Sequence, residues 1–214
     1  MIDDYRHKGL RKKLIESIRS KGITDEQVLD VMGALPRHFF LDKAFEEQAY
    51  KDQPFPIGSD QTISQPYTVA YQTQLLQVKK GDKILEIGTG SGYQACVLAM
   101  MGARVYTIER QRALFDKTKK LLTTLGFTRV KVHFGDGYKG LPVFAPFDKI
   151  IITAAPEEIP EELLKQLKQG GIMILPKGSS GHQVMCCITK LADGKYTIAE
   201  GENFSFVPML PGMK

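Results

Sequence analysis

The sequence is poor in the residues that build disulfide frameworks and metal sites. It has three cysteines in 214 residues, Cys96, Cys186 and Cys187, and their spacing fits no metal-ligand pattern. Cys186 and Cys187 are neighbours, and neighbouring side chains of a strand point to opposite faces. The N-terminus is polar and charged and has none of the features of a signal peptide. We therefore expect a cytoplasmic protein whose thiols stay reduced.

Long apolar runs are missing as well. No stretch approaches the ~20 apolar residues that span a membrane, so we expect no membrane partner. Histidine is scarce, and the four histidines are scattered through unrelated segments: His7, His38, His133 and His182. We expect each of them to lie at the surface or to be hydrogen-bonded within the fold, and we expect no bound metal and no catalytic histidine.

Charge is present in an ordinary amount and is weakly clustered. The net charge is +5 and the pI is about 9.0, with local concentrations of basic residues at 6–13 and 117–120. Mild basicity of this kind affects solubility and weak attraction to anions, so we expect no nucleic-acid partner. The length suits one domain with an added lobe. Since no repeat or linker interrupts the sequence, we predict a single domain over 1–214, and we expect a monomer.

The first third of the chain predicts helices around an irregular segment. Apolar residues at helical spacing predict a helix over 5–20. T-D-E-Q at 24–27 fits a capping box that starts a second helix, which Pro36 ends. Residues 50–66 contain three prolines and a glycine and show no apolar period, so we predict an ordered, functional loop. Pro66 suits a first helical position, and a third helix pattern follows it.

Strands and helices alternate between residues 81 and 176. Strands are predicted at about 83–87, 104–109, 130–134, 147–153 and 171–176, and helices near 92–101, 111–125 and 159–168. This alternation is typical of an α/β fold with a Rossmann-like, doubly wound and mostly parallel sheet. After residue 176, apolar and polar residues alternate in two runs, and Asp193-Gly194 between them is a hairpin-turn signal. These runs predict an antiparallel addition to the sheet edge. The predicted parts are N-terminal helices with a covering loop over 1–80, a cofactor-binding core over 81–176, and antiparallel strands over 177–214.

The stretch Lys83–Tyr93, K-I-L-E-I-G-T-G-S-G-Y, carries a specific chemical signal. Glycine allows positive φ and close approach of a ligand, and the free N–H groups at the start of the next helix can face that ligand. The dinucleotide fingerprint is G-x-G-x-x-G, whereas here Glu86 precedes G-x-G-x-G, formed by Gly88, Gly90 and Gly92. This spacing disfavours a nicotinamide oxidoreductase. The motif resembles motif I of the Rossmann-like S-adenosylmethionine-dependent methyltransferases.

Acidic residues at the ends of the next two strands support a cofactor site. At Glu109 a carboxylate can accept hydrogen bonds from both ribose hydroxyls, and we include the neighbouring Arg110 in the site. Asp136 could accept a hydrogen bond from the adenine amino group, with Gly137 admitting the ring. Taken alone, Glu109 could also cap a helix, and Asp136 could form a plain turn. Glu86 is expected to orient the loop or to favour a sulfonium cation through its charge.

A longer stretch resembles a particular family. Residues 58–70, G-S-D-Q-T-I-S-Q-P-Y-T-V-A, closely resemble the signature G-x-x-Q-T-I-S-Q-P-Y-x-V-A of the protein-L-isoaspartate O-methyltransferases. The resemblance covers nearly the whole chain, including the segment 52–57, the G-D-G turn at 135–137 and the strand 147–155. It also includes the F-V-P at 206–208. One departure is Ser205, where the family more often has an arginine before F-V-P.

The resemblance implies an activity and roles for particular residues. Members of the family transfer the methyl group of S-adenosyl-L-methionine to the α-carboxylate of L-isoaspartyl residues in damaged polypeptides, which are their partners. The ester collapses to a succinimide, and repair begins. Ser64 matches the catalytic serine, which is expected to donate a hydrogen bond to the substrate carboxylate or to hold the loop. The cofactor-covering segment is expected to be Gln61, Thr62, Ile63 and Ser64, and the substrate contacts are expected to include Ile57, Val207 and Pro208.

A carboxylate acceptor fits the composition of the chain. Because a carboxylate is already anionic at pH 7, its attack on an electrophilic methyl group needs no general base. One alternative is an S-adenosylmethionine-dependent methyltransferase acting on RNA or a small molecule, which a basic face or an N/D-P-P-Y/F motif would favour; the sequence has only mild charge and no such motif. Another is a non-enzymatic relative that binds the cofactor or a partner, and it would be expected to have lost Ser64 or the glycine motif.

Overall fold

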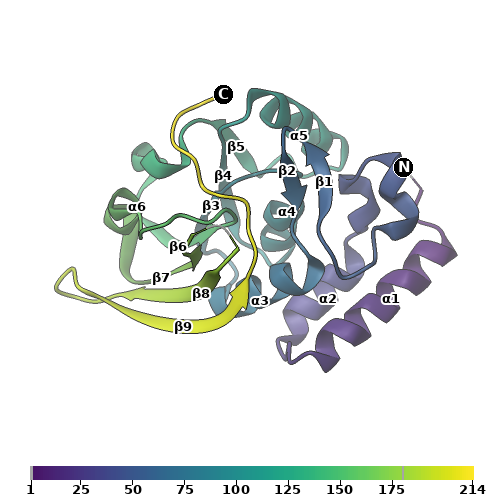
Figure 1. Ribbon diagram of the computed structural model, residues 1–214, viewed down its shortest axis with the longest axis horizontal. Coiled ribbons are helices and arrows are strands. Elements are labelled where there is room, and N and C mark those ends of the chain that lie inside the picture. The colour runs from purple at the N-terminus through teal and green to yellow at the C-terminus, as the bar shows by residue number, and fades with distance from the viewer. Residues whose placement is uncertain (1, 180) are drawn as a thin grey trace.

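A seven-stranded sheet crosses the molecule in the order β5-β4-β3-β6-β7-β8-β9, with helices against both of its faces (Figure 1). The computed structural model describes residues 2–179 and 181–214. Neighbouring strands from β3 to β7 are parallel, and β8 and β9 pair antiparallel at one edge. The predicted mostly parallel sheet with an antiparallel addition is therefore confirmed. The strands are β3 (Lys83–Ile87), β4 (Arg104–Glu109), β5 (Lys131–Phe134), β6 (Phe147–Ile152), β7 (Leu167–Lys177), β8 (Gln183–Lys190) and β9 (Tyr196–Phe204).

The sheet separates the hydrophobic core into two clusters, one between each of its faces and the helices that cover that face. Along β3, Ile84 belongs to the cluster beneath α3 and α4, and Leu85 belongs to the cluster beneath α6. Since strand side chains alternate between faces, Glu86 points to the same side as Ile84. The α-helices are α1 (Tyr5–Ser20), α2 (Glu26–Ala34), α3 (Pro66–Leu76), α4 (Tyr93–Met100), α5 (Arg112–Thr124) and α6 (Glu161–Gln166), and 3-10 helices span Arg37–Phe40, Lys43–Gln48, Gly137–Lys139 and Pro142–Phe144.

The caps of the N-terminal helices differ in one detail from the prediction. Asp4 caps α1, and the side chain of Asp25 accepts a hydrogen bond from the N–H of Val28 at the start of α2. The predicted capping box at 24–27 is therefore wrong in register, because the cap is Asp25 rather than Thr24. The shift has a simple cause, since an aspartate carboxylate one residue later reaches the free N–H group.

Residues 50–66 contain more regular structure than the predicted loop. Here β1 (Phe55–Gly58) and β2 (Gln61–Ile63) form an antiparallel hairpin, and α3 begins at Pro66 as predicted. The prolines concealed the hairpin because they interrupt the alternation that marks a strand. The predicted helix over 159–168 is also too long. It ends at Gln166, because Leu167 already pairs with Phe147 of β6.

The chain after β9 returns across the carboxyl ends of the parallel strands (Figure 1). We call residues 205–214 the C-terminal segment. The N–H of Ala155 donates to the carbonyl of Val207, and the N–H of Met209 donates to the carbonyl of Ala155, each at 2.8 Å. The segment therefore covers the end of β6. In the part of the chain that the structure describes, no helix has both the length and the apolar composition needed to cross a membrane.

Candidate active site

The strand order reverses beside β3, where β4 lies on one side and β6 on the other. Open α/β sheets bind ligands at such a switch point, outside the carboxyl ends of the strands. The N–H of Thr153, just after β6, donates to the carbonyl of Ile87 at 3.0 Å, which joins the ends of β3 and β6. The glycine turn that follows β3 therefore lies at the position where a ligand is expected.

The three glycines of the turn serve two different purposes. All have positive φ: 92° at Gly88, 51° at Gly90 and 84° at Gly92. Gly88 and Gly90 line a cavity. Gly92 instead lies against α5, where a Cβ atom would stand 2.8 Å from the Cγ2 of Thr118. Gly92 thus permits packing of the turn on α5, and only the first two glycines face the space for a ligand.

Glu109 braces the same turn. Its Oε2 accepts a hydrogen bond from the N–H of Gly90 at 2.8 Å, and its Oε1 accepts one from the N–H of Gln111 at 2.9 Å. The carboxylate is buried, and the residue lines the cavity at the glycine turn. The predicted residues around this cavity are Gln61, Thr62, Gly88, Gly90, Glu109, Arg110, Gly137, Val207 and Pro208.

Two residues expected at the cofactor also anchor the C-terminal segment. The carboxylate of Asp136 accepts from the N–H groups of Tyr138 and Gly212, both at 2.9 Å. The guanidinium of Arg110 donates to the carbonyls of Gly212 at 3.0 Å and Pro211 at 3.2 Å. Asp136 is not among the residues that line the cavity, although the adjacent Gly137 is. Sequence patterns did not reveal this anchoring function, because its partners are distant in the chain.

Glu86 is fully buried beside a narrow extension of the cavity, which Thr62, Ser64 and Gly88 also line. Neither oxygen of its carboxylate has a hydrogen-bond partner within residues 2–179 and 181–214. Burial raises the pKa of Glu86 to about 8, while the nearby Thr107 hydroxyl lowers it and the charge of Glu109 raises it further. A buried carboxylate without donors favours a cationic or hydrogen-bonding ligand.

The hairpin of β1 and β2 lies over the glycine turn. The Cδ1 atom of Ile57 would be 3.3 Å from a Cβ on Gly90, so the predicted substrate residue Ile57 packs against the turn. Ile63, buried in β2, and Ser64 both line the narrow extension of the cavity. The segment 61–64 thus lies beside the glycine turn.

Arg37 fixes the end of this segment and was not found from the sequence. It is fully buried, and it donates to the carbonyl of Ala49 at 3.0 Å and to the carbonyl of Ser64 at 2.9 Å. Its guanidinium lies 5.2 Å from the centre of the Tyr93 ring. The sequence held one sign of this role: Arg37 stands next to the aromatic residues of the run Pro36–Phe40. A charged residue that is buried among apolar neighbours is normally paired.

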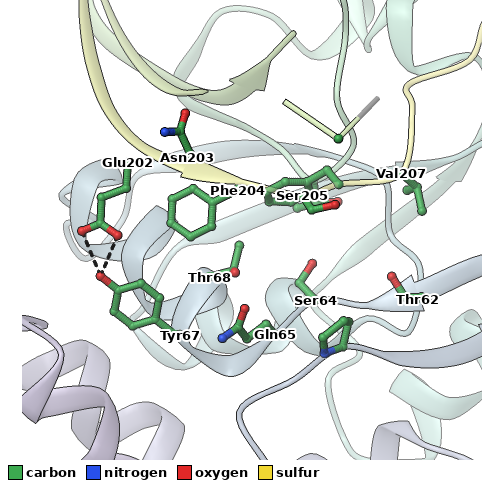
Figure 2. A pocket seen from close by; sticks show the side chains of 14 residues that line it. Thr62, Ser64, Gln65, Tyr67, Thr68, Glu202, Asn203, Phe204, Ser205 and Val207 are labelled. Atoms are coloured by element: carbon green, nitrogen blue, oxygen red, sulfur yellow. Dashed lines mark hydrogen bonds between the residues drawn. The ribbon is translucent and has the colours of Figure 1, made fainter. Parts of the chain in front are cut away.

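An open groove of about 530 Å³ adjoins the cavity, between the start of α3 and the chain around the end of β9. Figure 2 shows the hydroxyl groups of Ser64 and Thr62 turned towards it. Val207 lines the groove as well. Thr153 lines the groove, the cavity and its extension, and its hydroxyl donates to the carbonyl of Gly88 at 2.8 Å. Thr153 lies within the strand 147–155 that carries the family resemblance, but no local pattern singled it out as a site residue.

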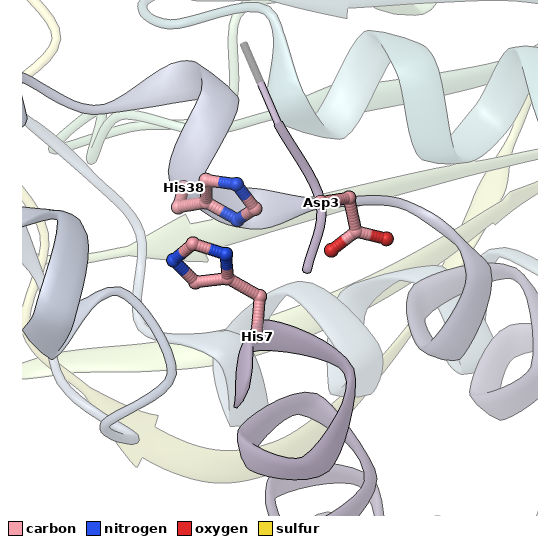
Figure 3. A group of neighbouring side chains, drawn as sticks. All are labelled: Asp3, His7 and His38. Atoms are coloured by element: carbon pink, nitrogen blue, oxygen red, sulfur yellow. The ribbon is translucent and has the colours of Figure 1, made fainter. Parts of the chain in front are cut away.

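His7 and His38 lie together, so the prediction that the histidines are scattered is wrong for these two (Figure 3). Their rings stack at 3.9 Å with Asp3 nearby. The nitrogens of His38 bond the Tyr50 hydroxyl at 2.6 Å and the Ile2 carbonyl at 3.1 Å, and both carboxylate oxygens of Asp3 accept from Arg11. Stacked rings cannot both direct an in-plane lone pair at one ion. The hydrogen bonds of His38 and Asp3 instead hold the residues at the N-terminus in place, and the ring of His7 stacks against them.

The comparisons with known proteins agree with one another. Residues 9–214 match the family model described as protein-L-isoaspartate(D-aspartate) O-methyltransferase (PCMT). A protein-L-isoaspartate O-methyltransferase of Christiangramia forsetii is 53% identical over 210 residues, which cover 98% of each chain. One from Salinibacter ruber is 45% identical over 218 residues, covering 97% of this chain and 94% of the other.

Solved structures resemble the whole fold. A protein-L-isoaspartate O-methyltransferase superposes with a TM-score of 0.84 at 29% identity; the match covers 92% of this chain and 65% of that longer chain. A β-aspartate methyltransferase (PCMT) from Plasmodium falciparum, solved with S-adenosyl-L-homocysteine, has a TM-score of 0.81 at 25% identity, covering 94% of this chain and 98% of the other.

Proposed function

The chain belongs to the protein-L-isoaspartate(D-aspartate) O-methyltransferase family, and we propose that it transfers the methyl group of S-adenosyl-L-methionine to the α-carboxylate of L-isoaspartyl residues in damaged polypeptides. The observation that carries the proposal is the position of Ser64, which lines both the open groove and the narrow cavity beside the glycine turn. A group held at Ser64 from the groove is therefore next to a ligand held at the turn. The product ester would collapse to a succinimide and so start repair.

The residues at the turn suit the cofactor. S-Adenosylmethionine supplies an electrophilic methyl group on a sulfonium centre when it is bound. The buried carboxylate of Glu86, without a donor among the described residues, would face the cationic end of this ligand. Glu109 would accept hydrogen bonds from the ribose hydroxyls, since each of its oxygens has only one backbone donor and can accept another. Gly88 and Gly90 would allow the close approach, and Gly137 would lie against the adenine.

Catalysis then depends on placement rather than on proton transfer. Because the acceptor carboxylate is anionic at pH 7, no residue has to remove a proton. We assign to Ser64 a hydrogen bond from its hydroxyl to this carboxylate, which fixes one oxygen in line with the methyl group. Thr62 and the hairpin would exclude water from the reacting atoms. Orientation of two reactants in this way can lower a barrier by several kcal/mol.

Replacing Ser64 by alanine is expected to lower kcat by about tenfold to a hundredfold, because one hydrogen bond to a charged group, worth about 1.5–3 kcal/mol, is lost from the reacting complex. The dissociation constant for S-adenosylmethionine should change by a factor of about three or less, since other residues hold most of that ligand. Methylation at saturating cofactor and calorimetric binding measure the two quantities. An unchanged kcat would remove Ser64 from the mechanism.

One experiment tests the acceptor. The protein is incubated with labelled S-adenosylmethionine and two peptides that differ only in isoaspartate or aspartate at one position. Base-labile methyl ester is expected only on the isoaspartyl peptide. Equal labelling, or labelling of RNA instead, would overturn the proposal.

We also infer a single-domain monomer that acts in the cytoplasm, with no nucleic acid and no membrane as partner. Support comes from the weak clustering of charge and from three free cysteines, two of them buried, which suit a reducing compartment. The molar mass measured by light scattering would be that of one 23.9 kDa chain.

A further inference from the structure

The groove beside Ser64 carries a single charge. Of the fourteen described residues that line it, Glu202 alone has a charged side chain. Ser205 contributes a small neutral hydroxyl to the lining of the groove. The chain as a whole has a net charge of +5, so this carboxylate gives the groove a sign opposite to that of the protein.

Glu202 is held in place from two sides. Both oxygens of its carboxylate accept from the hydroxyl of Tyr67, at 3.0 and 3.1 Å (Figure 2). Its backbone N–H donates to the hydroxyl of Tyr71, one turn further along α3, at 3.2 Å. The ring of Phe204 packs 5.1 Å from that of Tyr71. Burial and the Glu202 carboxylate together raise the pKa of Tyr67 to about 12, which keeps this hydroxyl a donor.

No cation of the described chain neutralises this carboxylate. Lys21 lies 5.8 Å from the centre of the Tyr67 ring, but its ammonium group forms an ion pair with Asp52 at 2.6 Å. Glu202 itself forms no ion pair within residues 2–179 and 181–214. Since the residue is exposed to solvent as well, its second lone pairs remain free to accept from a molecule lying in the groove.

We propose that Glu202 binds a lysine or arginine side chain in the sequence flanking the isoaspartyl residue, and so favours damaged polypeptides with a basic neighbour. The inference rests on the proposed function, which makes a polypeptide the occupant of the groove. Figure 2 shows Ser64 and Thr62 towards one end of the groove and Glu202 at the other, so a neighbour rather than the isoaspartyl residue meets Glu202. A pair of this exposure gives a preference of about twofold to fivefold.

The test compares isoaspartyl peptides with blocked ends that differ at one flanking position in lysine, norleucine or glutamate. The position is moved through three residues on each side. At one position or more, the wild-type protein is expected to show a kcat/KM about twofold to fivefold higher for lysine than for norleucine, carried by KM, and lower for glutamate. The preference should decrease as salt screens the pair. Glu202→Gln, which can still accept from Tyr67, should remove the difference.

Glu200→Gln is the matched control, because Glu200 is exposed on the same strand but does not line the groove. It should keep the preference of the wild-type protein. Equal rates for lysine and norleucine at every position, or a preference that survives Glu202→Gln, would overturn the proposal. Failure to methylate even the norleucine peptides would instead refute the proposed function, so the two outcomes are distinguishable.

Discussion

The Glu86→Gln variant is expected to be more stable than the wild-type protein at pH 8.5, with an advantage that shrinks as the pH falls to 5. Burial raises the pKa of Glu86 from 4.5 to about 8. Between these pH values the unfolded chain has lost the proton that the folded chain keeps, so rising pH favours unfolding by about 1.4 kcal/mol per pH unit. Glutamine does not ionise, and the difference in unfolding free energy should therefore grow by several kcal/mol across this range. Denaturant unfolding without cofactor, at a series of pH values, measures it.

The same substitution should weaken the binding of the cofactor. In the wild-type protein the affinity for S-adenosylmethionine should rise up to tenfold per pH unit below pH 8 and then level off, because Glu86 must lose its proton to meet a cation. Glu86→Gln should bind about tenfold to a hundredfold more weakly at pH 8, because the charge-assisted hydrogen bond between the carboxylate and the ammonium group of the ligand is lost, and its binding should depend little on pH. Calorimetry in buffers of different ionisation enthalpy would detect the released proton.

Asp82→Asn is a suitable control, since Asp82 lies at the other end of β3 and accepts a hydrogen bond from the N–H of Lys79. It should reproduce the pH profile of cofactor binding in the wild-type protein. A Glu86→Gln variant that shows the same pH profile as the wild-type protein, for both stability and binding, would show that Glu86 is ionised in the free protein.

The parts of this site that the sequence predicted are those with local patterns. The glycine turn and Glu109 each follow a strand that alternation and composition identify, and parallel strands bring their carboxyl ends to one edge. The hairpin of β1 and β2 was missed because prolines break the strand pattern. The register of the α2 cap depended on which of two adjacent residues reaches the same N–H group.

The remaining contacts join residues that are far apart in the chain. The link from Asp136 to Gly212 spans 76 positions, and that from Tyr67 to Glu202 spans 135. In neither pair does the hydrophobic periodicity around one residue indicate which distant residue it will contact. The stacking of His7 on His38 likewise follows from the packing of α1 against the 3-10 helix at Arg37–Phe40. Such pairs depend on tertiary packing, which periodicity does not encode.

Arg37→Met is expected to reduce both stability and turnover, because Arg37 joins the core to the backbone of Ser64. The substitution leaves the buried carbonyl of Ala49 and the partly buried carbonyl of Ser64 without donors, and it removes the cation over the Tyr93 ring. Each such group costs about 1–3 kcal/mol, so we expect a loss of about 3 kcal/mol in unfolding free energy. Burial lowers the pKa of Arg37 to about 10, and the group therefore remains charged at neutral pH.

The kcat of the folded variant separates positioning from general destabilisation. Arg11→Met is the matched control, since Arg11 is also buried and donates to the carbonyl of Gly33 at 2.7 Å, but it holds the N-terminus and not the segment 61–64. Both variants should be destabilised, while only Arg37→Met should lower kcat, by about tenfold or more, because a displacement near 1 Å at the reacting groups is enough for such a loss. Arg37→Lys should be intermediate, since a single ammonium group cannot match the two-pronged guanidinium. If Arg37→Met and Arg11→Met kept the same kcat at a temperature where both are folded, the contact with Ser64 would have no part in placing the serine.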